Sequence, residues 1–383
     1  MARIAPDGAR GKIMRAAERL AYIDGWRVIA ILLVFADHLG MNREIGAFYE
    51  RSAFGVLSQY GETGVFIFFF ISGYVVSLTS LREVERTGGF SAPAFYARRF
   101  FRIVPPLMLY LAALMGLALA GVIEFSPVNF VSAALYLCNS TAPGVSCDWY
   151  VGHTWSLAFE EQFYCLFPAA FAWMTLGKAP RPTLAAAALA FAALPFVFTI
   201  WWIGKIGCLI AYALFFAGYA AAARGAAIQR LFADVRLPAF TVAALVVFMP
   251  RSVVASFGDD EAMRAELIAW FRLAYVGAIP VLVLLSGAAE SPLRKALSIG
   301  ALAGLGRASY SIYLWQQLCN GPVFNGLGVA AQFALIGGAI LFCLGLFRIE
   351  LKLIGLGQAL SSRLRRRGEE QAAAPALAMD PAS

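Results

Sequence analysis

The sequence predicts an all-α, polytopic integral membrane protein. Of its 383 residues, 61% are hydrophobic and only 14% are charged, whereas about 25% of the residues in a typical soluble domain are charged. The mean hydropathy is +0.71. Long apolar runs recur along the whole chain, and runs of this length are typical of helices that cross a bilayer.

We expect about ten transmembrane helices, because the apolar runs lie near the length that about 30 Å of hydrocarbon requires. The seventh run is short, and the ninth is rich in Gly and Ser. The runs cover approximately residues 22–40, 62–81, 103–123, 158–176, 183–203, 206–223, 237–249, 267–286, 300–319 and 327–347.

The basic residues predict an orientation with both termini in the cytoplasm. Lys and Arg gather in the N-terminal segment, in the even-numbered connections and after the last run, whereas residues 121–159 contain none. This pattern accounts for the net charge of +8 without nucleic acid as a partner. The expected organisation is a cytoplasmic segment 1–20, a membrane domain 21–350 and a basic, then disordered, cytoplasmic tail 351–383.

The first apolar run carries ionisable side chains, which are costly at membrane depth and call for a reason. We interpret this run as a retained helix rather than a signal peptide, because Asp37 and His38 interrupt it. Arg27 and His38 are eleven positions apart, so they lie about 20° apart around the axis and about 16 Å apart along it.

A neutral imidazole at His38 can remove a proton from a hydroxyl group. Asp37 can orient that ring only if the helix ends there, because adjacent helical residues point in different directions. The alternative is an interfacial histidine that bonds to a neighbouring helix.

The stretch "FYARRFFRIVPPLMLY" predicts a cluster of cations at the cytoplasmic end of the third run. Arg99 and Arg102 share a helical face, and Pro105 and Pro106 suit the first turn of the membrane helix. Paired guanidinium groups near a helix N-terminus favour phosphate or another anion. The alternative is simple anchoring of the helix at the membrane surface.

Two further stretches place polar groups in apolar surroundings. The stretch "HTWSLAFEEQFY" begins with His153 and places Glu160 one turn before Tyr164. Glu160 enters an apolar segment, where a carboxylate needs a partner. The stretch "ASYSIYLWQQL" adds Tyr313 and Gln316, which either line a polar cavity or bond between helices. Interfacial aromatic anchoring is the alternative for the first stretch.

The cysteines indicate no metal site, because no CxxC or His-rich spacing is present. Cys138 and Cys147 lie in the connection without basic residues, which we expect outside the cell membrane. An oxidising exterior permits a disulfide between them. Two unpaired thiols remain the alternative, because spacing does not fix the geometry.

Together, five stretches give the chain a resemblance to the membrane acyltransferase-3 family, which O-acylates glycans and other hydroxyl compounds. The stretches are "YIDGWRVIAILLVFADH", "GVFIFFFISGYVVS", "FYARRFFRIVP", "HTWSLAFEEQFY" and "ASYSIYLWQQL". They follow the family order and cover about residues 20 to 350. The resemblance implies about ten helices and cytoplasmic acyl-CoA as the donor substrate, with no tightly bound cofactor.

The resemblance also implies roles for individual residues. Arg27 and His38 match the essential pair of the first helix, and Glu160 matches the acid of the Trp-Ser-Leu-x-x-Glu motif. Gln316 departs from the pattern, because many members have histidine there. We therefore expect catalytic roles for His38, Arg27 and Glu160, acyl-CoA binding by Arg99 and Arg102, and support from Asp37, His153, Tyr164, Tyr313 and Gln316.

The resemblance implies O-acylation, acetylation by default, of a cell-surface glycan or glycolipid at the bacterial inner membrane. Exopolysaccharide and lipopolysaccharide are the expected acceptors by analogy. The expected partners are acyl-CoA, the acceptor and the bilayer; the oligomeric state is left open. Two alternatives remain, a transporter or flippase without acyl transfer, and the same chemistry on a lipid or small metabolite. His38 either deprotonates the acceptor or carries the acyl group covalently.

Overall fold

The computed structural model describes residues 7–41, 53–177, 204–288, 291–324 and 326–377, together with the isolated positions 46, 193 and 197. Every regular element among these residues is helical, which confirms the all-α prediction. The longest helices are α1 (Asp7–Gly40), α3 (Gly61–Thr87), α4 (Ala92–Leu119), α7 (Trp155–Leu176), α9 (Gly204–Leu231) and α17 (Val329–Leu377).

Shorter helices connect the long ones and complete the bundle. They are η1 (Ala53–Tyr60), α5 (Pro127–Ala134), α6 (Trp149–Gly152), α10 (Arg236–Val247), α11 (Arg251–Ala255), α12 (Glu261–Leu273), α13 (Tyr275–Ser286), α14 (Pro292–Leu297), α15 (Gly300–Arg307), α16 (Ser309–Cys319) and η2 (Pro322–Phe324).

Within the described residues, four helices are long and apolar enough to cross a membrane: α3 with part of η1, α4, α9 and α17. The pair α12 and α13, bent by 43°, makes a fifth if it counts as one span. These helices indicate an integral membrane protein. Helix α1 is equally long, but Asp24, Arg27 and Asp37 interrupt its apolar part.

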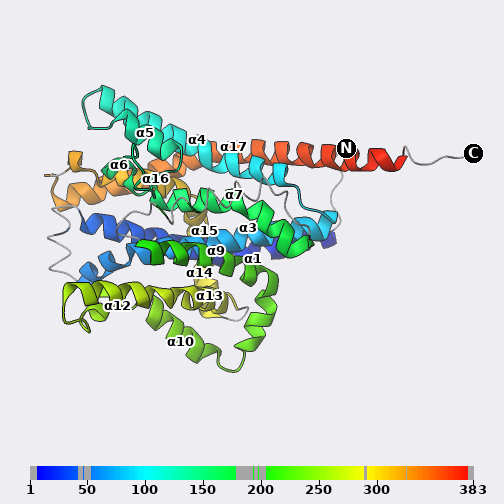
Figure 1. The fold of residues 1–383 in the computed structure, drawn as a ribbon, viewed down its shortest axis with the longest axis horizontal. Helices are drawn as coiled ribbons and strands as arrows, with labels where there is room; N and C mark the ends of the chain where they lie inside the picture. Colours follow the sequence, from blue (N-terminus) through cyan, green and yellow to red (C-terminus); the bar gives the residue numbers. More distant parts are fainter. Residues whose placement is uncertain are drawn as a thin grey trace, which may run out of the picture.

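Ten spans and the cytoplasmic placement of both termini stay predictions. The expected run 183–203 lies outside the described residues, apart from positions 193 and 197. The run 237–249 corresponds to the short α10, and the run 300–319 is divided between α15 and α16 at Ala308. In Figure 1, the start of α1 and the end of α17 lie toward the same end of the molecule.

Helices α1, α3 and α9 run through the centre of the molecule, between α4 with α17 on one side and α10 with α12 and α13 on the other (Figure 1). Glycine allows the close crossing of α3 and α9. A Cβ atom on Gly73 would collide with the Phe215 carbonyl, and one on Gly218 would collide with the α3 backbone. Phe163 of α7 stacks on Phe215 with ring centroids 4.3 Å apart, which extends the core to α7.

The start of α4 differs from the prediction. The helix begins at Ala92, where the Ser91 hydroxyl accepts a hydrogen bond from the Ala94 amide, so Pro105 and Pro106 lie inside it. Ser91 is a favoured capping residue, and this local signal determines the start. Arg99 and Arg102 consequently project from the middle of α4, where the charge of a helix N-terminus has faded.

The connection between α4 and α7 contains the disulfide that the sequence left open. Cys138 and Cys147 are joined, with their Cα atoms 5.7 Å apart. Asn139 then ties this connection to α7, because its side-chain amide donates to Gln162 over 2.9 Å. At the other end of the chain, α17 continues as a helix to Leu377 and includes the basic run from Arg363.

Candidate active site

Two pockets lie along α1, and the predicted site residues are divided between them. The first, here called the arginine pocket, is lined by Arg27 and by residues of α3, α4, α7 and α16. The second, here called the histidine pocket, is lined by His38 and by residues of α3, α6, α11 and α12. Arg27 and His38, which are eleven residues apart on α1, thus line different pockets.

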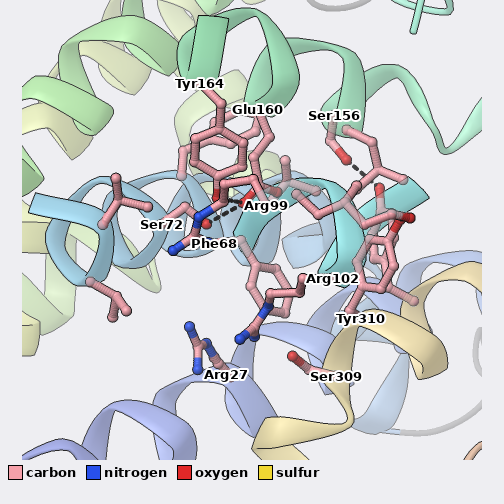
Figure 2. Close-up of a pocket in the computed structure, with 17 residues that line it drawn as sticks. Arg27, Phe68, Ser72, Arg99, Arg102, Ser156, Glu160, Tyr164, Ser309 and Tyr310 are labelled. Carbon is pink, nitrogen blue, oxygen red and sulfur yellow. Dashed lines mark hydrogen bonds between the residues drawn. The ribbon is translucent and has the colours of Figure 1, made fainter. Parts of the chain in front are cut away.

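Three guanidinium groups face a common space in the arginine pocket (Figure 2). Arg27 pairs with Asp24 over 2.8 Å. Arg99 lies over the ring of Tyr164, with 5.0 Å from its Cζ atom to the ring centroid. Arg102 has no ion pair or hydrogen bond among the described residues. The pocket therefore holds cationic groups whose charge is only partly balanced.

Glu160 enters the arginine pocket from α7 and not the histidine pocket. Its Oε1 atom accepts hydrogen bonds from the Ser72 hydroxyl of α3 over 2.6 Å and from the Tyr164 hydroxyl. Figure 2 shows both bonds. Because hydroxyl groups satisfy this carboxylate, it forms no ion pair with the arginines and leaves them available to an anionic ligand.

The arginine pocket suits a phosphorylated ligand with an apolar portion. Guanidinium groups bind phosphate through several hydrogen bonds. Apolar side chains, including Val65, Phe68 and Phe69, complete the walls. Among the described residues, no group of three or more His, Cys, Asp or Glu side chains could hold a metal ion.

In the histidine pocket, Gln316 of α16 holds the ring of His38. The His38 Nδ1 atom lies 2.7 Å from Gln316 Nε2 and 3.0 Å from Gln316 Oε1. Asn320 donates to Gln316 Oε1 over 3.2 Å, and Gln316 Nε2 donates to Gln317 Oε1 over 3.3 Å. The amide is thus fixed on both sides, and His38 Nε2 makes no hydrogen bond to a described residue.

Asp37 does not orient His38. Helix α1 continues to Gly40, so consecutive side chains diverge. The Asp37 carboxylate instead faces Arg251, with 4.0 Å between Oδ1 and Nη2. The expected support for the imidazole comes from Gln316, the position at which the sequence departs from the family pattern.

A charged cluster at the histidine pocket was missed from the sequence. Glu62 of α3 pairs with Arg272 of α12 and lies 3.6 Å from Arg251 of α11. All three side chains line the pocket. The signal that could have revealed the cluster is Arg272, a cation within an apolar run, which calls for a partner.

The two pockets meet at Val65 and Tyr313, which line both. The Tyr313 hydroxyl donates to the His153 carbonyl over 2.7 Å and lies 2.6 Å from the Ser156 hydroxyl. Helix α16 crosses the junction: Ser309 and Tyr310 face the arginine pocket, and Gln316 lies one turn beyond Tyr313, beside His38. His153 also lines the histidine pocket.

Comparisons with known proteins identify the family of the chain. A family model described as an acyltransferase domain matches residues 20–348. The O-acetyltransferase OatA of Staphylococcus aureus (strain NCTC 8325) is 26% identical over 189 residues, which is 46% of this chain and 28% of OatA. A protein provisionally named an O-acetyltransferase in S. aureus strain COL is 29% identical over 157 residues, or 38% of this chain and 24% of that protein.

The chain spans about a quarter of the length of these relatives in the matched regions. No solved structure matches it significantly. The matching domain and the membrane-length helices define a membrane protein with an acyltransferase domain. Because the family model covers most of the chain, the protein belongs to the acyltransferase-3 family.

Proposed function

We propose that this protein transfers an acyl group, acetyl by default, from cytoplasmic acyl-CoA to a hydroxyl group of a cell-surface polysaccharide or glycolipid. The expected location is the bacterial inner membrane. The observation that carries this proposal is that the two pockets adjoin, because Val65 and Tyr313 line both. One pocket offers guanidinium groups to the donor, and the other offers an imidazole to the acceptor.

In this proposal, Arg27, Arg99 and Arg102 bind the phosphates of acyl-CoA, and the thioester extends toward Tyr313. The partly unbalanced positive charge of the arginine pocket supports this role. Glu160 and Tyr164 act indirectly: their hydrogen bond to each other holds the Tyr164 ring beneath Arg99.

His38 acts as the general base on the acceptor hydroxyl. When Gln316 Oε1 accepts the Nδ1 proton, Nε2 is left unprotonated and free to take a proton. The oxygen then bonds to the thioester carbon, the C–S bond breaks, and the proton passes from His38 to the leaving sulfur. The acyl group moves directly from sulfur to oxygen, with no covalent intermediate on His38.

The test uses a deletion strain that carries plasmid copies of the wild type or of His38→Ala. Mass spectrometry of the surface glycans should show the acyl substituent with the wild type only, while membrane fractions hold both proteins in equal amounts. An acyl substituent at the wild-type level in His38→Ala would refute the mechanism. Loss of the whole polymer from the deletion strain would favour export instead of acyl transfer.

A further inference from the structure

His153 is buried, and its two ring nitrogens are unused. Its relative exposure is 3%, and it lines the histidine pocket. The Leu314 carbonyl lies near the ring, yet neither ring nitrogen forms a hydrogen bond of normal geometry with a described residue. Buried polar atoms nearly always have a partner, so a ring like this one calls for a ligand.

The ring lies at the level where the two pockets meet. Its centroid is 5.3 Å from that of Tyr313, the side chain that lines both pockets. Along α16, Tyr313 comes one turn after Tyr310 of the arginine pocket and one turn before Gln316, the partner of His38. His153 therefore lies on the histidine-pocket side of Tyr313, beside the side chain that both pockets share.

The surroundings hold the ring in one orientation. Tyr110 of α4 packs edge-on against it, with ring centroids 5.9 Å apart, and Tyr313 packs on another side. The backbone of His153 is fixed as well, because its carbonyl accepts the Tyr313 hydroxyl. A polar group fixed before the reaction needs no reorganisation during it, and this is what makes such a donor effective.

We propose that a ring N–H of His153 donates a hydrogen bond to the thioester carbonyl oxygen and stabilises the negative charge that develops there. This inference rests on the proposed acyl-CoA-dependent transfer. A neutral imidazole carries one such donor. As the acceptor oxygen bonds to the carbonyl carbon, the carbonyl electron pair moves to its oxygen, which His153 binds. The pair returns when the C–S bond breaks, and the sulfur takes the proton held by His38.

The test measures the initial rate of radiolabelled acetyl incorporation from acetyl-CoA, in membrane vesicles that contain the native acceptor. His153→Phe keeps the ring shape and removes the donor. Loss of one such donor lowers kcat by about 100- to 1,000-fold, and KM for acetyl-CoA should stay within about twofold of the wild type. His153→Gln restores an N–H near the same place and should recover at least part of the rate.

Tyr60→Phe is the control, because it removes the hydroxyl group of a buried tyrosine that lines neither pocket. Its hydroxyl donates to the Phe248 carbonyl over 2.8 Å, so its loss should lower thermal stability without changing kcat. Wild-type kcat in His153→Phe would overturn the inference and leave the proposed function intact. Equal losses in His153→Phe and His153→Gln, with equal loss of stability, would also overturn it. No incorporation by the wild type would overturn the proposed function itself.

Discussion

The carboxamide of Gln316 shows how one side chain can determine the chemistry of another. Imidazole offers a donor and an acceptor, and the group that binds one nitrogen decides which role the other takes. Gln316 is held by Asn320 and Gln317, so its orientation toward His38 is set by α16 itself. A base that is fixed in this way does not need a carboxylate neighbour.

We predict that Gln316→Leu lowers kcat by about tenfold or more without changing KM for acetyl-CoA, because His38 loses its orienting bond while the arginine pocket stays intact. Steady-state assays of acetyl transfer at several acetyl-CoA concentrations measure both constants. A rise in KM with an unchanged kcat would show that Gln316 serves donor binding instead.

Arg102 and Arg98 belong to one motif but have different surroundings, which makes them a matched pair. Arg102 has no ion pair among the described residues and lines the arginine pocket. Arg98 donates hydrogen bonds to Glu83 over 2.8 Å and to Ser361 over 2.6 Å, and it lines neither pocket.

We predict that Arg102→Gln weakens binding of coenzyme A by about tenfold or more, because a charge-assisted bond to phosphate is lost. Arg98→Gln should leave this affinity unchanged and lower the thermal midpoint, because buried Glu83 loses its partner. Calorimetry in detergent measures the affinity. If Arg98→Gln weakened the binding of coenzyme A and Arg102→Gln only lowered the thermal midpoint, Arg102 would not belong to the proposed donor site.

At the scale of single residues, the sequence singled out charged side chains that line the two pockets, but not the groups that bind them. Arg27, Arg99, Arg102 and His38 stand out because charges are rare in apolar runs. Their contacts are less visible: His38 and Gln316 are 278 positions apart. Which helices become neighbours depends on packing across the whole bundle, and local patterns do not contain that information.

Among the elements, α3 and α9 illustrate how small residues bring membrane helices together. Helix association in lipid depends on close packing of surfaces, and glycine permits that approach. Gly73 and Gly218 meet at the α3–α9 crossing. Gly73 lies within the apolar run 62–81, and nothing in that run indicates that α9 supplies the opposing surface. The same crossing positions Ser72, which binds Glu160.

We predict that Gly73→Ala destabilises the protein by about 1–3 kcal/mol, because the added methyl group collides with the α9 backbone. The control is Gly116→Ala in α4, where a Cβ atom meets nothing within 4 Å. Thermal unfolding followed by size-exclusion chromatography measures both variants. Equal thermal stability of Gly73→Ala and Gly116→Ala would contradict the close crossing of α3 and α9.

The ends of the helices were harder to predict from the sequence than the presence of the helices. The apolar run of α4 begins near Ile103, but the helix begins at Ala92, because Ser91 caps it and polar residues extend it beyond the apolar part. The run 300–319 is one apolar stretch, and yet it forms two helices. Hydropathy indicates whether a segment lies in lipid or in water, whereas capping and packing determine where its helix starts or bends.

On the scale of the whole molecule, the two pockets lie along one helix and meet at Tyr313 inside the bundle. The Cys138–Cys147 disulfide and the basic-free connection around it support an exterior location for the loop between α4 and α7. The loop carries Cys147 and Trp149 into the lining of the histidine pocket. The proposed acceptor pocket therefore lies beside the loop that we expect to be outside.

We predict that a membrane-impermeant thiol reagent labels Cys147 in spheroplasts only after mild reduction, because the disulfide with Cys138 blocks its thiol and we expect its loop to lie outside. Mass spectrometry of the peptides identifies the labelled positions. The buried Cys208 and Cys343 are internal controls and should stay unlabelled. Labelling of Cys147 without reduction would contradict the disulfide, and labelling of reduced Cys147 only after lysis would contradict the orientation.

The central claim is that acyl-CoA from the cytoplasmic side of the membrane reacts at His38 with an acceptor from the outer side. The most direct measurement uses sealed inside-out membrane vesicles that hold the native acceptor in their lumen and receive radiolabelled acetyl-CoA from outside. The account predicts that wild-type vesicles accumulate labelled acceptor in the lumen and that His38→Ala vesicles do not. Luminal label at the wild-type level in His38→Ala would contradict it.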